Sequence, residues 1–271
     1  MPTNCDTESL AGRVHVDADR CRAGLAGPEI VKNQYFGDIN DYRKYGLLRC
    51  FVDAGFSLGV CWMLTPDTPN HDGQKTGYLT QPAGWRRFDP PLFDFLASRV
   101  GSGIRSVREL ERSNLMSGAR YCSEVCPDAA AARSVYMASA LHGLSSADLL
   151  FFDPDNGLEV KSKPYGSPSS SKYLFWRDVE QAWSCGASLL IFQHYTRESR
   201  ETLTNRLYDE LSSRTKAALV APIHTAHVLF LFCGKPTHVA RFETAARIIN
   251  ERWAGQSSVA VSNGSEQPAK V

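Results

Sequence analysis

The sequence feature that most constrains this chain is the stretch from Leu149 to Glu159, which reads LLFFDPDNGLE. Four bulky apolar residues run without alternation into an acidic turn, a pattern typical of a strand buried on both faces. In open α/β sheets, ligands bind outside the carboxyl ends of such strands. We therefore expect Asp153, Asp155 and Asn156 at a functional site. The simpler interpretation is that these residues only end the strand and bond their own backbone.

The rest of the chain alternates strand-like and helix-like segments. Strands are predicted at 56–64, 148–153, 187–193 and 226–233, the last paired with 217–221, and helices at 39–54, 91–99, 106–114, 129–141, 172–185, 198–214 and 239–253. This alternation predicts a doubly wound, mostly parallel, Rossmann-like α/β sheet with helices on both faces. We assign residues 29–254 to this single domain, 1–28 to a flexible leader and 255–271, rich in Ser, Gln and Gly, to a disordered tail.

Composition narrows the function classes only slightly. The formal net charge of +1 gives the whole chain no general attraction to nucleic acid or membrane. No apolar run reaches the ~18 residues of a membrane-spanning helix, so no membrane partner is expected. The 8 cysteines are scattered and no signal peptide is recognised, which favours reduced thiols and a cytoplasmic location. The oligomeric state is not indicated.

Polar residues follow three of the predicted strands. Thr65 and Asp67 follow the first, Asp153 the second, and His194 the third. If these strands are neighbours, their ends share one crevice, as in a Rossmann-like enzyme. The alternative for His194 is a hydrogen-bonded histidine that only closes its strand.

The segment from Lys32 to Arg49 interleaves aromatic, amide and charged residues more densely than an amphipathic helix requires. Its basic residues, including Arg43, together with Tyr35 and Phe36, predict phosphate contacts and a stacking surface for RNA, DNA or a nucleotide. Asp38 or Asn40 is expected to cap the helix that follows. The alternative is a capped helix with a solvated charged face.

These patches together resemble the bacterial large-subunit ribosomal RNA adenine-N6 methyltransferases, a class I S-adenosylmethionine-dependent family. The family opens with Gly-Asn-x-x-Asp-x-x-Lys-His, and its cofactor strand ends in an Asp-Thr turn that leads to glycines. Its catalytic motif is Asp-Pro-Pro-Tyr. The matching residues here are Gly37, Asp38, Asp41, Lys44 and Tyr45, then Asp67, Thr68 and Gly73, then Asp153, Pro154, Asp155 and Asn156.

The resemblance implies a methyltransferase-like fold and enzyme that acts on nucleic acid or a nucleotide. It implies S-adenosylmethionine as cofactor. Taken together with the strand-end residues and the segment from Lys32 to Arg49 described above, it predicts three sets of site residues. The cofactor set is Asp67, Thr68, Gly73 and Lys44; the catalytic set is Asp153, Asp155, Asn156 and His194; the substrate set is Tyr35, Phe36, Asp38, Asp41 and Arg43. Asn156 stands where the family has its stacking aromatic, so Phe36 or Tyr195 would have to supply that ring.

Two other functions fit the same residues. In a metal-dependent nuclease or phosphodiesterase, Asp153, Asp155 and Glu159 would bind Mg²⁺ through oxygen ligands while Lys161 or His194 assists attack by water. In the other, the chain is a non-catalytic Rossmann-like module that binds a partner.

Overall fold

Four parallel strands lie side by side and form one half of the sheet in the computed structural model, which describes residues 33–66 and 73–260. They are β2 (Arg120–Cys122), β1 (Leu58–Cys61), β3 (Leu149–Phe152) and β6 (Ser188–His194) in spatial order. Antiparallel β8 (Val228–Gly234) follows, then β7 (Leu219–Thr225) and β9 (Ser257–Val259), each antiparallel to its neighbour. The predicted pairing of the late strands is confirmed.

The direction of winding changes at β1. From β1 the chain proceeds to β2 on one side, and it then crosses back to β3 on the other side of β1. Such a topological switch point is where open α/β sheets form a crevice. All four β3 residues are buried, with Leu149 and Phe151 in one apolar cluster and Leu150 and Phe152 in the other.

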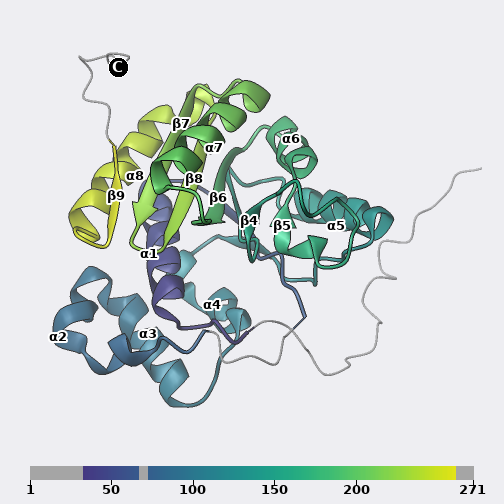
Figure 1. Ribbon diagram of the computed structural model, residues 1–271. Helices are drawn as coiled ribbons and strands as arrows, with labels where there is room; N and C mark the ends of the chain where they lie inside the picture. The colour runs from purple at the N-terminus through teal and green to yellow at the C-terminus, as the bar shows by residue number, and fades with distance from the viewer. Residues whose placement is uncertain (1–32, 67–72, 261–271) are drawn as a thin grey trace, which may run out of the picture. The chain divides into compact units, whose positions relative to one another are not determined.

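Helices cover both faces of the sheet (Figure 1). α1 (Ile39–Asp53) and α8 (Val239–Arg252) pack on one face, whereas α5 (Ala130–Gly143), α6 (Trp176–Ser184) and α7 (Arg200–Thr215) pack on the other. The predicted Rossmann-like α/β fold, mostly parallel and covered on both faces, is therefore confirmed.

α1 is buried nearly all round, including charged residues that an amphipathic helix would expose. Of the two predicted caps, Asp38 is the one that caps the helix, and it accepts a hydrogen bond from Asn40 N. A Cβ at Gly46 would lie 1.8 Å from the Trp253 ring, so helix and indole approach as closely as glycine allows. Arg43 donates from both Nε and Nη2 to Gln256 Oε1, at 3.1 and 2.7 Å.

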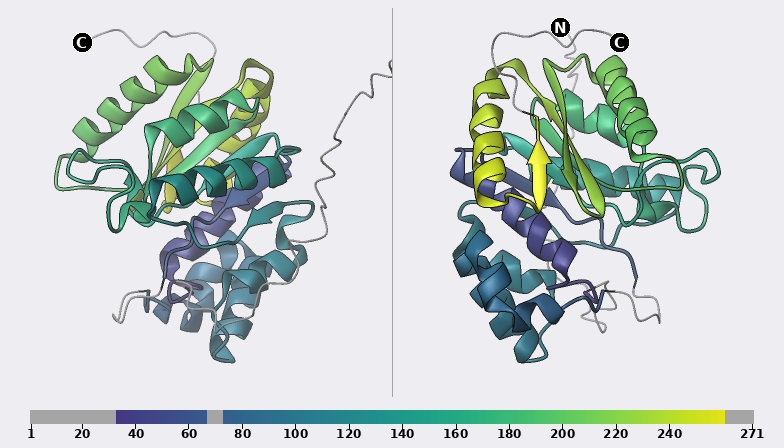
Figure 2. Two further views of the ribbon diagram at one scale, coloured as in Figure 1. Left: turned by 90° about the vertical axis from the view of Figure 1, so that its right-hand side faces the viewer. Right: turned by 60° about the vertical axis from the view of Figure 1, so that its left-hand side comes forward.

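A helical insertion joins β1 to β2 and lies below the sheet in Figures 1 and 2. It contains α2 (Pro82–Trp85), α3 (Pro90–Gly101) and α4 (Val107–Arg112). The insertion also contains short 3₁₀ turns, at Gly77–Thr80, Arg86–Phe88 and Asn114–Met116. Two further 3₁₀ turns lie later in the chain, at Ser170–Lys172 and Pro236–His238. The sequence predicted α3 and α4 but neither α2 nor β2, whose three residues form a partly exposed edge strand with no apolar run.

Two predicted boundaries are corrected. The helix expected from residue 172 begins at Trp176, because Tyr173–Leu174 forms β5 and pairs with β4 (Gly157–Leu158). β9 lies inside the segment assigned to a disordered tail, so the sheet extends to residue 259.

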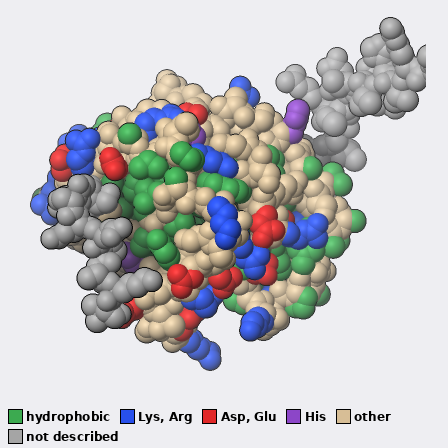
Figure 3. Space-filling model, turned by 90° about the horizontal axis from the view of Figure 1, so that it is seen from above, with side chains coloured by type: hydrophobic (Ala, Val, Ile, Leu, Met, Phe, Trp, Pro, Cys, Tyr) green, Lys and Arg blue, Asp and Glu red, His purple; other side chains and the backbone are tan. Residues whose placement is uncertain are grey.

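Three further features of the described residues concern membrane-spanning helices, cysteines and surface charge. Within the described ranges, no helix is long and apolar enough to cross a membrane. The cysteines described there are free thiols, buried apart from Cys185. The face seen in Figure 3 mixes basic and acidic side chains instead of presenting one sign of charge.

Candidate functional site

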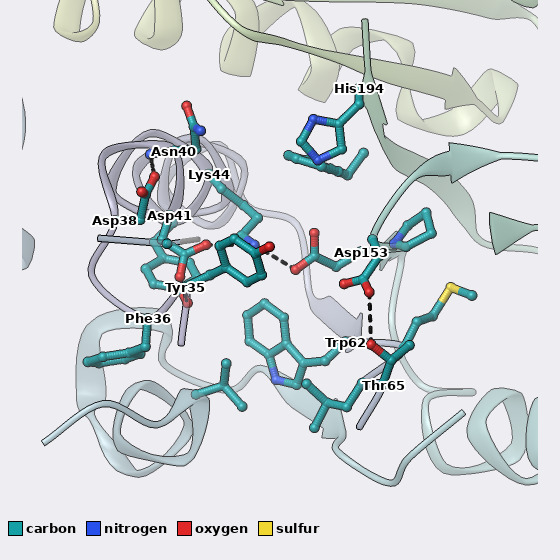
Figure 4. Close-up of a pocket in the computed structure, with 18 of the residues that line it drawn as sticks. Tyr35, Phe36, Asp38, Asn40, Asp41, Lys44, Trp62, Thr65, Asp153 and His194 are labelled. Atoms are coloured by element: carbon teal, nitrogen blue, oxygen red, sulfur yellow. Dashed lines mark hydrogen bonds and ion pairs between the residues drawn. The ribbon is translucent and has the colours of Figure 1, made fainter. Parts of the chain in front are cut away.

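A cavity of about 310 Å³ opens at the carboxyl ends of β1, β3 and β6. α1 supplies one wall, with Asp41 and Lys44, and the strand ends supply Thr65, Asp153 and His194 (Figure 4). The expectation that these strands are neighbours and share a crevice holds for the residues described. Asp67 lies outside them.

Lys44 is the centre of the cavity's polar network. Its Nζ lies 2.6 Å from Asp153 Oδ2 and 2.8 Å from Asp41 Oδ1. Tyr45 Oη donates to Asp41 Oδ2 at 2.9 Å. The three charged side chains are only 7–13% exposed. Because a buried carboxylate is costly without a partner, the ammonium holds both carboxylates in place.

Aromatic rings enclose the same ammonium. The ring centroids of Tyr45, Trp62 and Phe192 lie 5.5, 5.8 and 5.4 Å from Lys44 Nζ. Rings at these distances attract a cation through their negative faces. This region of the cavity is therefore built to hold positive charge.

Burial and the charge of Lys44 have opposite effects on the pKa of Asp153. Burial raises the pKa of Asp153 to about 6, although the neighbouring Lys44 acts to lower it. For Lys44, burial acts to lower the pKa, but Asp153 and Asp41 outweigh it and hold the pKa above its usual range. At pH 7 the two groups are therefore a carboxylate and an ammonium.

His194, at the end of β6, adds an imidazole to the cavity. Burial and the charge of Lys44 lower the pKa of His194 below its usual value. The imidazole is therefore neutral at pH 7, and a neutral imidazole has one nitrogen that can accept a proton.

The acidic turn after β3 is held in place by hydrogen bonds and close packing. Asp155 Oδ2 accepts a hydrogen bond of 2.8 Å from Thr65 Oγ1, which ties the end of β3 to the end of β1. Gly157 has φ +93°, and a Cβ there would lie 2.4 Å from Gln193 Oε1. Gln193 in turn accepts from Leu158 N. The turn is thus fixed against both neighbouring strands.

Most predicted site residues come together. Around the cavity lie Asp153, Asp155, Asn156, His194, Lys44, Gly73, Tyr35, Phe36, Asp38 and Asp41. Asp67 and Thr68, predicted to bind cofactor, lie outside the described residues. The functional roles of the assembled residues remain predictions.

Three predicted substrate residues have structural partners instead. Phe36 is 1% exposed and packs against Tyr45 and Phe95, so its face is not open to a base. Asp38 is committed to the cap of α1 and to Lys75 N. Arg43 is buried against Gln256 and does not line the cavity, so it is not a phosphate contact there.

The predicted metal-binding set is not assembled. Glu159 accepts a hydrogen bond from Trp176 N at the start of α6 and does not line this cavity. Asp153 is paired with Lys44. Within residues 33–66 and 73–260, no three carboxylate, imidazole or thiol side chains are grouped to hold a metal ion.

Several cavity residues were not predicted. Trp62 and Phe192 line it as aromatic walls, and Val107 reaches it from the insertion. In the sequence, the first two belong to apolar strand segments and carry no separate signal. Met63, beside Trp62, has a φ of +48°, a conformation that a sequence does not reveal for a non-glycine residue.

Comparisons with known proteins gave one solved structure. No protein-family model matches the chain, and no curated protein matches it. The chain is similar to a crystal structure of human methyltransferase-like protein 13 in complex with SAH, with 13% sequence identity and a TM-score of 0.35. The match covers 78% of this chain and 91% of that chain.

Proposed function

We propose that the chain is an S-adenosylmethionine-dependent methyltransferase that modifies a nucleobase in nucleic acid or a nucleotide. The place of the acidic turn carries this proposal. Asp153 to Asn156 follows β3, directly beside the switch-point strand β1, and opens into the same cavity as the end of β1. Ligands of open α/β sheets bind at this position.

The residues of the cavity fit such a cofactor. The volume of about 310 Å³ falls within the range of small-molecule sites. The carboxylate of Asp155, which lines the cavity and is not the partner of Lys44, suits the positive charge of such a cofactor. The end of β1, from Trp62 to Thr65, would hold the cofactor together with Asp155. The cofactor supplies an electrophilic methyl group when bound.

Asp153 has the properties of a group that orients an acceptor amine. Its carboxylate is fixed by Lys44 at 2.6 Å and can accept a hydrogen bond from an N–H of the acceptor. Such positioning brings the nitrogen lone pair toward the methyl group without prior ionisation of the base. Neutral His194, which lines the same cavity, would receive the proton that the amine loses.

Calorimetric titration with SAH tests the proposal. We expect the wild-type chain to bind SAH, and Asp153→Asn to keep binding within about fivefold, because the substitution preserves shape. The same variant should lose transfer of labelled methyl groups to RNA, DNA or nucleotides.

Absence of SAH binding by the wild type up to ~1 mM would overturn the proposal. Binding with no transfer to any of these acceptors would favour the non-catalytic binding module.

A further inference from the structure

The cavity wall remote from the sheet is assembled from distant parts of the chain. Residues 35–38, residues 73–75 and Val107 contribute to it. Two of these parts are joined directly: Ile39 N donates to Lys75 O at 3.1 Å, and Lys75 N donates to Asp38 Oδ2 at 3.2 Å. The wall depends on such links because none of its parts belongs to the central sheet.

Arg105 connects the same two parts a second time. It lies between α3 and α4, outside the cavity lining. Its Nε donates to Phe36 O at 2.9 Å, and its Nη2 donates to Gly73 O at 2.5 Å. Hydrogen bonds from a charged donor are stronger than those between neutral groups. One guanidinium therefore clamps two wall segments that are far apart in sequence.

Gly73 can occupy its position in this contact only because it has no side chain. It has φ +79°, and a Cβ on it would lie 2.5 Å from Gln34 O and 2.8 Å from Tyr35 Cδ1. Gly73 thus packs directly on Tyr35, the half-buried aromatic residue that lines the cavity (Figure 4). A shift of Gly73 would move the surface that Tyr35 offers to a ligand.

We propose that Arg105 is a positioning residue that sets the affinity of the cavity for its adenosine-bearing ligand by holding Tyr35 and Gly73 together. The identity of the ligand rests on the proposed function. Because Arg105 does not line the cavity, its loss should weaken binding and leave the chemical step nearly unchanged.

The test compares Arg105→Met, which removes both donors, with Arg105→Lys, which keeps the charge and a single donor group. Arg112→Met is the matched control, because Arg112 is an α4 residue with a 71% exposed side chain and a surface ion pair to Glu109. SAH is the titrated probe. We expect Kd to rise about tenfold or more in Arg105→Met and less in Arg105→Lys, and to change less than about twofold in Arg112→Met.

Methyl-transfer kinetics supply the second readout. KM for the cofactor should rise in parallel with Kd while kcat stays within about threefold of the wild type. Gly73→Ala, which disturbs the same contact from the other side, should weaken SAH binding in the same way. If Arg105→Met does not fold, Arg105→Lys and Gly73→Ala decide the matter.

The outcomes separate the two proposals. Wild-type binding of SAH that is equally tight in folded Arg105 and Gly73 variants overturns the role of Arg105 and leaves the methyltransferase function standing. A fall in kcat with unchanged KM overturns it too. Failure of the wild type to bind SAH overturns both.

Discussion

At the scale of single residues, the pairing of Lys44 with Asp153 is the feature that sequence reasoning came nearest to and still missed. Both residues were predicted site residues, one for cofactor and one for catalysis. They are 109 positions apart, and the structure joins them at 2.6 Å. Motif order can place two residues at one edge of a sheet, but only the packing of α1 on that sheet decides that they touch.

Substitution of Lys44 by Met should destabilise the fold strongly. It leaves the buried Asp41 and Asp153 without their shared cation, a loss expected to cost about 3 kcal/mol of unfolding free energy. Urea denaturation measures it, with exposed Lys161→Met as control. Equal stability of the two variants would show that the buried pair contributes little.

Methyl transfer should decline at acid pH as Asp153 takes up its proton. The pKa of Asp153 is about 6, so activity should fall as the pH drops through 6. A rate profile flat from pH 5 to 7 would contradict this role.

The same raised pKa affects the free energy of unfolding. Between about pH 4 and pH 6 the folded chain binds more protons at Asp153 than the unfolded chain does, so the contribution of Asp153 to stability declines as the pH rises through this range.

At the scale of elements, the strands that could be predicted from the sequence are those whose residues form continuous apolar runs. β3 and β6 are apolar runs covered on both faces, and both were located to within a residue or two. β2 and β9 have three residues each at the sheet margins, where pairing, not hydrophobic pattern, makes the strand. α1 was predicted as a helix, yet its charged side is buried by elements that follow it much later in the chain.

The contact between α1 and Trp253 makes Gly46 sensitive to a single added methyl group. The added Cβ would lie 1.8 Å from the indole, and overpacking of this kind costs about 1–3 kcal/mol. Gly143→Ala is the matched control, since Gly143 is also helical and has no neighbour within 4 Å of its would-be Cβ. We expect Gly46→Ala to lower the melting temperature and Gly143→Ala to leave it equal or raised. Equal melting of both variants would contradict the close packing.

At the scale of the whole chain, the candidate site depends on segments far from it in sequence. Polar residues at strand ends were predictable because sheet topology gathers them. The aromatic enclosure of Lys44 was not, since Tyr45, Trp62 and Phe192 come from three separate elements whose apolar patterns already serve the core.

Truncation should reveal this dependence. A chain that ends at residue 252 lacks Trp253, Gln256 and β9, and therefore loses partners of Gly46, Arg43 and β7. We expect it to bind SAH at least about tenfold more weakly and to melt earlier. A chain that ends at residue 260 keeps every contact described here and should behave as the full chain does. Equal binding by both truncations would show that α1 holds its place without them.

The link between Arg43 and Gln256 spans 213 positions and has a consequence for biosynthesis. Translation delivers α1 before the segment that contains Gln256, so the native partner of Arg43 is absent until that segment leaves the ribosome. Until then Arg43 lacks the two hydrogen bonds that it donates to Gln256, although the partners of Lys44 have already been synthesised. A nascent chain should consequently reach its full affinity for the ligand only after residue 259, the end of β9, has left the ribosome.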